Sequence, residues 1–314
     1  MNNPIALVGE LNEQQTNHWL NLLNNAMPGE NIIAFEQLTE QQKQECEIAI
    51  VANPEPKDIA QLPNLVWLHS LWAGVEKLVA AFKNSSLNIV RLIDPNLTNA
   101  MSEAVLTWTL YLHRDMPHYI AAQKKCSWQS KPYTLPNERT VGVLGLGELG
   151  KTAAERLANN NFNVLGWSRS QKNAKGVTTF HGEDGLNQVL AASDILVILV
   201  PLTENTHNLI NSKRIALMKP SSSIINFARG AIIETDSLLD ALNKNKLNHA
   251  VLDVFEQEPL PEQSSLWQHE KITVLPHISA QTNPKSASEI VAKNIRTYRE
   301  TNTVPPTVNL KVGY

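Results

Sequence analysis

Residues 141–158 read VGVLGLGELGKTAAERLA, and this stretch decides the fold. An apolar strand, a glycine loop and an alanine-rich helix follow one another, and Gly145, Gly147 and Gly150 have the G-x-G-x-x-G spacing. In a dinucleotide-binding βαβ unit the first glycine permits a tight turn, the second lets the backbone approach a pyrophosphate, and the third lets the helix pack on the strand. The N–H groups at the start of the helix then face the phosphates. The stretch therefore predicts a doubly wound dinucleotide-binding domain.

The same stretch also fits a second motif. Residues 145–152, GLGELGKT, match the G-x-x-x-x-G-K-[ST] pattern of a phosphate-binding loop. That pattern would direct Lys151 toward phosphates and would need a metal-binding Asp at the end of a later strand. The inner Gly147 and the pattern downstream favour the dinucleotide, and nucleotide-dependent phosphotransfer stays open as an alternative.

Composition limits the class of protein. The chain has 314 residues, a hydrophobic content of 42%, a charged content of 18% and a net charge of −3, which predicts about two globular domains. This charge balance argues against nucleic acid or an anionic membrane as a partner. The two cysteines, Cys46 and Cys126, form neither a disulfide framework nor a metal motif. We therefore expect no metal site. Since the N-terminus also lacks the features of a signal peptide, we expect a cytoplasmic protein.

Short apolar runs alternate with amphipathic stretches along the whole chain, which predicts parallel sheets covered by helices. The longest apolar run, at 195–200, is too short to span a bilayer. One apolar stripe predicts a single long helix over 99–125. The predicted strands, besides the one before the glycine loop, are 5–9, 31–36, 47–52, 65–71, 88–93, 163–168, 195–200, 223–228, 249–255 and 272–277.

The strand after the glycine loop ends without the acidic residue that usually binds a ribose 2′-OH. Residues 163–170 read NVLGWSRS, so Ser168 and Arg169 occupy that place. Serine does not repel a 2′-phosphate, and the guanidinium of Arg169 can pair with one. The stretch predicts NADP(H) as cofactor, with NAD(H) possible.

Three later segments carry polar residues at predicted strand ends. Arg229 follows a strand in INFARGAII, Asp253 lies within a predicted strand in VLDVFEQEPLP with Glu258 in the loop after it, and His277 ends a strand in VLPHISAQT. An open α/β sheet binds its ligand at the carboxyl ends of its strands. An arginine can hold and polarise a 2-keto acid, and a histidine can donate the proton that an alkoxide needs.

These segments resemble the D-isomer-specific 2-hydroxyacid dehydrogenase family over nearly the whole chain. The glycine loop, PLTENTHNLIN (201–211), NFARG, LDVFEQEPL and LPHISAQT occur in the family's order. The stretches LWAGVEKL (71–78), LHRDMPHY (112–119), GWSRS and EPLPEQSSLW look like the glyoxylate/hydroxypyruvate reductase A branch. The resemblance implies NADPH-dependent reduction of glyoxylate or hydroxypyruvate to the (R)-2-hydroxy acid.

The resemblance also implies roles for single residues. Arg229 would bind and polarise the substrate, His277 would donate the proton, and Glu258 would fix the tautomer of the imidazole. Asp253 would face the nicotinamide side of the cofactor, and the backbone around Ala73 and Gly74 would hold the substrate carboxylate. Further cofactor contacts are implied at Glu148, Leu149, Pro201, Thr206 and Ala228.

The alternation and the resemblance together predict an α/β protein with two Rossmann-like domains and a cleft between them. A flavodoxin-like substrate domain would comprise residues 1–99 completed by 285–314, and the dinucleotide-binding domain would span 100–284. The resemblance further implies a homodimer built on the dinucleotide-binding domains. A non-catalytic, dinucleotide-sensing corepressor of the same fold is the alternative, although the complete set of Arg229, Glu258 and His277 argues against it.

Overall fold

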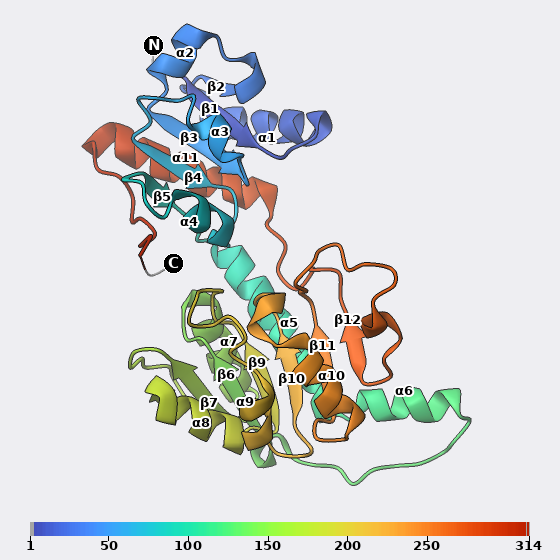
Figure 1. Ribbon diagram of the computed structural model, residues 1–314. Coiled ribbons are helices and arrows are strands. Elements are labelled where there is room, and N and C mark those ends of the chain that lie inside the picture. The colour runs from blue at the N-terminus through green and yellow to red at the C-terminus, as the bar shows by residue number, and fades with distance from the viewer. Residues whose placement is uncertain (1–2, 312, 314) are drawn as a thin grey trace. The chain divides into compact units, whose positions relative to one another are not determined.

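The computed structural model describes residues 3–311 and 313 and has two parallel sheets, which confirms the predicted α/β class (Figure 1). One sheet has five strands and the other has seven. The described residues form two compact units. One consists of the residues up to Leu97 together with those from Thr282 on, and the other is Thr98–Gln281.

The first unit is built on the five-stranded sheet, whose order β2-β1-β3-β4-β5 is the flavodoxin-like order. Every neighbouring pair of strands is parallel. The strands are β1 (Ile5–Gly9), β2 (Ile32–Ala34), β3 (Ile48–Ala52), β4 (Trp67–Ser70) and β5 (Asn88–Val90). The helices are α1 (Glu13–Ala26), η1 (Phe35–Gln37), α2 (Glu40–Glu45), α3 (Pro56–Ile59), α4 (Glu76–Phe82) and α11 (Pro284–Thr301).

Both faces of this sheet are buried, because successive residues of a strand point to opposite sides. Ile5 and Leu7 of β1 pack with α1 and α11, whereas Ala6 and Val8 pack on the side of α3 and α4. These four side chains are at most 3% exposed. Burial on both faces explains why the strands appear in the sequence as short, uninterrupted apolar runs.

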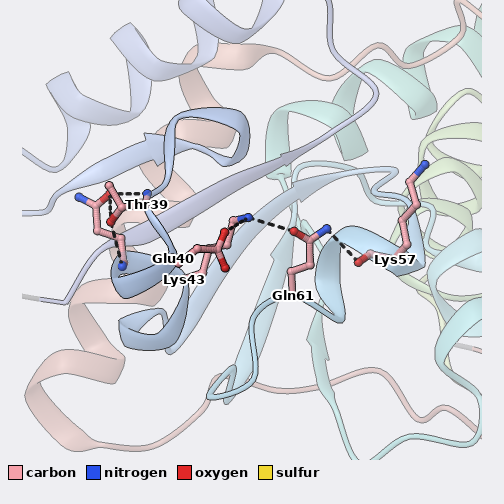
Figure 2. Close-up of polar contacts among 6 residues, drawn as sticks. Thr39, Glu40, Lys43, Lys57 and Gln61 are labelled. Atoms are coloured by element: carbon pink, nitrogen blue, oxygen red, sulfur yellow. Dashed lines mark hydrogen bonds and ion pairs between the residues drawn. The ribbon is translucent and has the colours of Figure 1, made fainter.

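The short helices α2 and α3 were not predicted, because helices of six and four residues show no apolar period. The Thr39 hydroxyl caps α2 by accepting an N–H of its first turn. Figure 2 shows Lys43 donating to both Glu40 and Gln61. The Gln61 amide in turn donates to the Lys57 carbonyl of α3. These contacts bridge the two helices at the surface, where each adds at most about 1 kcal/mol.

His69 of β4 is a buried histidine that connects the sheet to α11. Its Nδ1–H donates to the Ser70 carbonyl at 2.9 Å, so its Nε2 accepts the Asn294 amide at 2.8 Å. The ring is 0% exposed. Burial away from water lowers the pKa of His69 to about 4. The neutral ring is therefore part of the folded state.

This burial should make the first unit sensitive to acid. The unfolded chain binds a proton at His69 near pH 6.5 but the folded chain only near pH 4, so the stability tied to this residue is complete above pH 6.5 and is lost between these values. We expect wild type to lose about 2 kcal/mol through His69 between pH 7 and pH 5. His69→Gln should lack that part of the pH dependence. Urea unfolding at both pH values measures the difference, and an equal change in both proteins would contradict the expectation.

The second unit is built on the seven-stranded parallel sheet, with the order β12-β11-β10-β9-β6-β7-β8. The strand order reverses between β6 and β9. The strands are β6 (Thr140–Leu144), β7 (Asn163–Ser168), β8 (Thr178–His181), β9 (Ile195–Ile198), β10 (Ser223–Asn226), β11 (His249–Leu252) and β12 (Ile272–Val274). The helices are α5 (Pro95–His113), of which residues 95–97 belong to the first unit, α6 (Met116–Lys124), η2 (Pro136–Glu138), α7 (Glu148–Asn159), α8 (Gly182–Ala192), α9 (Ser212–Leu217), η3 (Gly230–Ile232), α10 (Thr235–Asn243) and η4 (Ser265–Gln268).

This sheet is also packed on both faces. The helix after the glycine loop, α7, packs on one of them. Val141 and Val143 of β6 pack with α5 and α7, and Leu144 packs on the side of α8, α9 and α10. Within residues 3–311 and 313, no helix is long and apolar enough to cross a membrane.

The predicted single helix over 99–125 is wrong. It is interrupted between α5 and α6, where Asp115 has a φ of 54° and Pro117 occupies the first turn of the second helix. Strand β8 was missed because it is short and partly exposed. Strands β9 to β12 end two or three residues earlier than predicted, so Asp253 follows β11 rather than lying within it.

Candidate active site

The predicted site residues of the second unit lie at the carboxyl ends of its strands. An open α/β sheet binds ligands at this edge, near the point where the strand order reverses, which here lies between β6 and β9. The glycine loop follows β6, Ser168 ends β7, Pro201 follows β9, Ala228 and Arg229 follow β10, Asp253 follows β11, and His277 follows β12.

The glycine loop has a shape that fits a dinucleotide. Gly145 has a φ of +100°, and a side chain there would collide with the backbone of Leu199 and Val200. A side chain at Gly150 would overlap the Gly145 carbonyl, so α7 begins in contact with the end of β6. At Gly147 a Cβ would meet nothing within 4 Å, and Gly147 forms no side-chain cap on α7. The N–H groups of the first turn, from Glu148 on, therefore open onto space that suits a pyrophosphate.

The end of β7 carries a hydroxyl where a carboxylate would bind a ribose. Ser168 is 9% exposed and donates its hydroxyl to the Ser170 carbonyl at 2.7 Å. Arg169 follows in an exposed position, and Lys172 lies in the same connection. Neutral and cationic groups at this place suit a phosphorylated ribose.

The loop after β9 is held by Thr206. Its hydroxyl donates to the Pro201 carbonyl at 2.6 Å and accepts the Thr203 N–H at 2.7 Å. The residue therefore fixes the turn that carries Pro201. Contact of Pro201 or Thr206 with a cofactor stays a prediction.

Arg229 lies in the turn between β10 and η3. Its Nη1 donates to the Ala228 carbonyl at 2.6 Å, and its side chain is partly buried. The last residue of β10, Asn226, is 1% exposed and bonds to the same turn through both ends of its amide. The turn and the guanidinium are thus held at the edge of the sheet.

Glu258 and His277 are hydrogen-bonded to each other. Oε2 of Glu258 accepts Nδ1–H of His277 at 2.7 Å, and its Oε1 accepts the Phe255 N–H at 2.9 Å. The side chains are 35% and 50% exposed. With Nδ1 engaged by the carboxylate, Nε2 is the nitrogen that can exchange a proton with a ligand.

Asp253 fixes the backbone that follows His277. It is 2% exposed, and its two carboxylate oxygens accept the N–H groups of Ile278 at 2.7 Å and Ser279 at 2.9 Å. His277 has a φ of 53°, a conformation that non-glycine residues seldom adopt. Two charge-assisted bonds directly after it hold the strained residue in place. Contact of Asp253 with the nicotinamide stays a prediction.

The loops that carry these residues are joined side by side. Backbone hydrogen bonds connect residues 208–210 to 231–234. A side chain at Gly230 would overlap the backbone of Phe255 and Glu256, so the loops after β10 and β11 are in contact. The bonds of Asp253 and Glu258 join the loop after β11 to that after β12. Arg229, Glu258 and His277 therefore lie on one connected set of loops.

The remaining predicted residues lie elsewhere. Ala73 and Gly74 belong to the first unit, in the loop between β4 and α4, and their contact with a substrate stays a prediction. In the part of the chain that the structure describes, no group of three or more His, Cys, Asp or Glu side chains could hold a metal ion.

Comparison with known proteins shows the family to which the chain belongs. Residues 106–279, more than half of the chain, match the D-isomer specific 2-hydroxyacid dehydrogenase, NAD binding domain. The chain belongs to this dehydrogenase family. Glyoxylate/hydroxypyruvate reductase A of Citrobacter koseri is 33% identical over 302 residues, which cover 94% of this chain and 96% of the relative.

Solved structures of the family share the fold. The D-isomer specific 2-hydroxyacid dehydrogenase of Xanthobacter autotrophicus, in complex with NADPH and MES, has a TM-score of 0.92 and 36% identity, covering 98% of this chain and 99% of that one. The NADPH-dependent glyoxylate/hydroxypyruvate reductase of Sinorhizobium meliloti, in complex with NADP and sulfate, has a TM-score of 0.90 and 29% identity, covering 99% and 100%.

Membership in this dehydrogenase family removes the phosphotransfer alternative for the glycine loop, since the matched domain binds NAD. It confirms the resemblance inferred from the motifs. One polar residue of the site was not singled out from the sequence, namely Asn226. The available signal was an amide inside the largely apolar run SIINFA (223–228).

Proposed function

We propose that this member of the dehydrogenase family reduces small 2-keto acids with NADPH, glyoxylate to glycolate and hydroxypyruvate to the (R)-2-hydroxy acid. The observation that carries the proposal is the 2.7 Å pair of His277 and Glu258, on the sheet edge that also holds Arg229 and the glycine loop. The relatives from Citrobacter koseri and Sinorhizobium meliloti, named as glyoxylate/hydroxypyruvate reductases, support the substrate class.

In the proposed reaction Arg229 binds the substrate carboxylate, and its charge polarises the keto group and stabilises the developing alkoxide. The reduced dinucleotide, when bound, supplies the hydride that adds to the keto carbon. His277 donates the Nε2 proton to the alkoxide oxygen. Glu258 holds the ring in the required orientation and stabilises the imidazolium by its charge. One hydride and one proton thus convert the keto acid to the hydroxy acid.

The first test is a matrix of NADPH and NADH against glyoxylate, hydroxypyruvate, pyruvate and phenylpyruvate, measured as kcat/KM with purified protein. The proposal expects the highest values for NADPH with glyoxylate or hydroxypyruvate, and (R)-glycerate as the product of hydroxypyruvate. Failure to oxidise NADPH with every one of these acids would overturn it. Dinucleotide-dependent capture of a protein without turnover would instead support the corepressor alternative.

The preference for NADPH rests on Arg169 and predicts a selective effect. Arg169→Ala should raise KM for NADPH by about 10-fold or more, because a charge-assisted contact to the 2′-phosphate is lost. KM for NADH, which lacks that phosphate, should change by less than about 2-fold. Lys175→Ala removes another exposed cation from the β7–β8 connection and serves as the control. Equal effects of Arg169→Ala on both cofactors would refute the assignment.

We also propose a homodimer that forms through α6 and the loop after it. Helix α6 and this loop extend away from the sheet of the second unit (Figure 1). Their exposed apolar side chains include Ile120, Trp128 and Tyr133, of which Trp128 is fully exposed. Several large apolar side chains left exposed on one segment are a feature of protein interfaces. Light scattering should give twice the chain mass of 34.9 kDa, and a monomer mass at micromolar concentration would contradict the dimer.

A further inference from the structure

We propose that Asn226 is a positioning residue for Arg229, so that it determines how well the enzyme binds the carboxylate of its substrate. The inference rests on the proposed function, in which Arg229 holds that carboxylate. It concerns a residue that touches neither the substrate nor the cofactor in this scheme and acts only through the turn it supports.

Asn226 is bonded to the Arg229 turn at two points. Its Nδ2 donates to the Arg229 carbonyl at 2.9 Å, and its Oδ1 accepts the Ala228 N–H at 3.1 Å. Its own carbonyl accepts the Asp253 N–H at 3.1 Å, so its backbone is fixed in the sheet as well. Asn226 is 1% exposed, so these bonds lie within the fold. Asn226 therefore connects the rigid strand β10 to the turn that carries the guanidinium.

The guanidinium is anchored to the same turn. Nη1 of Arg229 donates to the Ala228 carbonyl at 2.6 Å, so the side chain follows the backbone of residues 228 and 229. Asn226 fixes the Ala228 N–H, which belongs to the peptide before the Ala228–Arg229 peptide. It also fixes the Arg229 carbonyl, which belongs to the peptide after it. The Ala228–Arg229 peptide plane is therefore held from both sides. A rotation of that plane would carry the Ala228 carbonyl, and Nη1 with it, away from its place at the sheet edge.

No other side chain of this size can make both bonds. An amide presents a donor and an acceptor on a short stem, whereas a carboxylate is an acceptor only. A cavity of about 190 Å³ borders Asn226 and Gly230, so a shortened side chain would not be replaced by packed neighbours. Removing the amide therefore takes the side-chain partner away from the Ala228 N–H and the Arg229 carbonyl and lets the turn move.

The test compares three variants of β10. Asn226→Ala removes both bonds, and Asn226→Asp keeps the size and the acceptor but loses the donor to the Arg229 carbonyl. Ser223→Ala is the matched control, because Ser223 is 3% exposed at the opposite end of the same strand and accepts a side-chain bond from Asn248 at 3.3 Å. Steady-state kinetics with glyoxylate and NADPH give KM for each substrate separately.

For both Asn226 variants we expect kcat/KM for glyoxylate to fall by about 10- to 100-fold, mainly through a higher KM for glyoxylate, because a small misplacement of a substrate-binding group has effects of this size. KM for NADPH should rise less than KM for glyoxylate, since Ala228 is only one of the predicted cofactor contacts, and all parameters of Ser223→Ala should change by less than about 2-fold. An equal rise in KM for glyoxylate and in KM for NADPH would indicate a general loss of structure and would overturn the proposal. Unchanged kinetics of both variants would overturn it as well.

Hydrogen exchange tests the same proposal without relying on activity. The peptide spanning residues 227–233 should exchange faster in Asn226→Ala than in wild type, since the Ala228 N–H loses its acceptor, and it should be unchanged in Ser223→Ala. Unchanged exchange in Asn226→Ala would refute the positioning role. If wild type reduced no 2-keto acid, the proposed function would fail and the exchange result alone would decide on the role of Asn226.

Discussion

Replacing His277 by asparagine is expected to lower kcat by about 100-fold or more, because the alkoxide formed by hydride addition then lacks its proton donor. The amide of asparagine can still bond to Glu258, so the loop after β12 should keep its shape. Asp253 holds that loop by separate bonds to Ile278 and Ser279. The loss should therefore appear in kcat, with KM for NADPH little changed. Stopped-flow measurement of NADPH oxidation separates the hydride step from product release.

Two further variants make this result specific. Glu258→Gln keeps a side chain of the same shape beside Nδ1 but removes the negative charge, so a smaller loss in kcat is expected. His18→Asn changes an exposed histidine of α1 in the first unit and should leave kcat unaltered. A fall of less than about 3-fold in His277→Asn would show that the proton comes from another group.

Replacing Arg229 by glutamine should lower kcat/KM for glyoxylate by about 1,000-fold. Two charge-assisted hydrogen bonds to a carboxylate and the polarised keto group are lost together, and about 4 kcal/mol corresponds to this factor. Since the charge of Arg229 also stabilises the alkoxide in the proposed reaction, both KM and kcat should be affected. Initial rates over a wide range of glyoxylate concentrations measure the two effects separately.

Lysine at the same position keeps the charge without the planar fork of donors, so Arg229→Lys should retain more activity than Arg229→Gln. Arg156→Gln is the matched control. Arg156 lies on α7 in the same unit and donates to Asn99 and Ser102 of α5, so its loss should affect stability but not KM for glyoxylate. Equal kinetic losses in the Arg156 and Arg229 variants would contradict a role in substrate binding.

Much of the fold could be predicted because buried parallel strands appear as apolar runs and the glycine loop marks where the dinucleotide unit begins. The predicted ranges of β1 and β7 agree with the structure to the residue. The interruption of the predicted helix over 99–125 was missed although Pro117 signals a helix start. The apolar stripe continues past Pro117, so the pattern predicts one helix where the structure has two. Strand β8 could not be predicted from pattern, since its four residues are exposed or half-buried.

For the site, the sequence identifies residue types at strand ends, and chemistry then indicates their roles. It does not show which backbone groups those side chains meet. The two bonds of Asp253 join segments 25 and 26 residues apart, and they depend on the pairing of β11 with β12. The bonds of Asn226 are local and stay within the stretch NFARG. The bonds of Asp253, in contrast, follow from tertiary structure, which no short motif encodes.

The side-by-side contact of the loops has a consequence for redesign. Because Gly230 lies against Phe255, and Asp253 and Glu258 hold the segment around His277, these loops should not behave as interchangeable modules. Grafting the loop after β10 from a relative with a different residue against Phe255 would displace His277, the proposed proton donor, as well. Changes of substrate range should therefore succeed when residues 226–279 are exchanged as one block, and should fail when a single loop is transplanted.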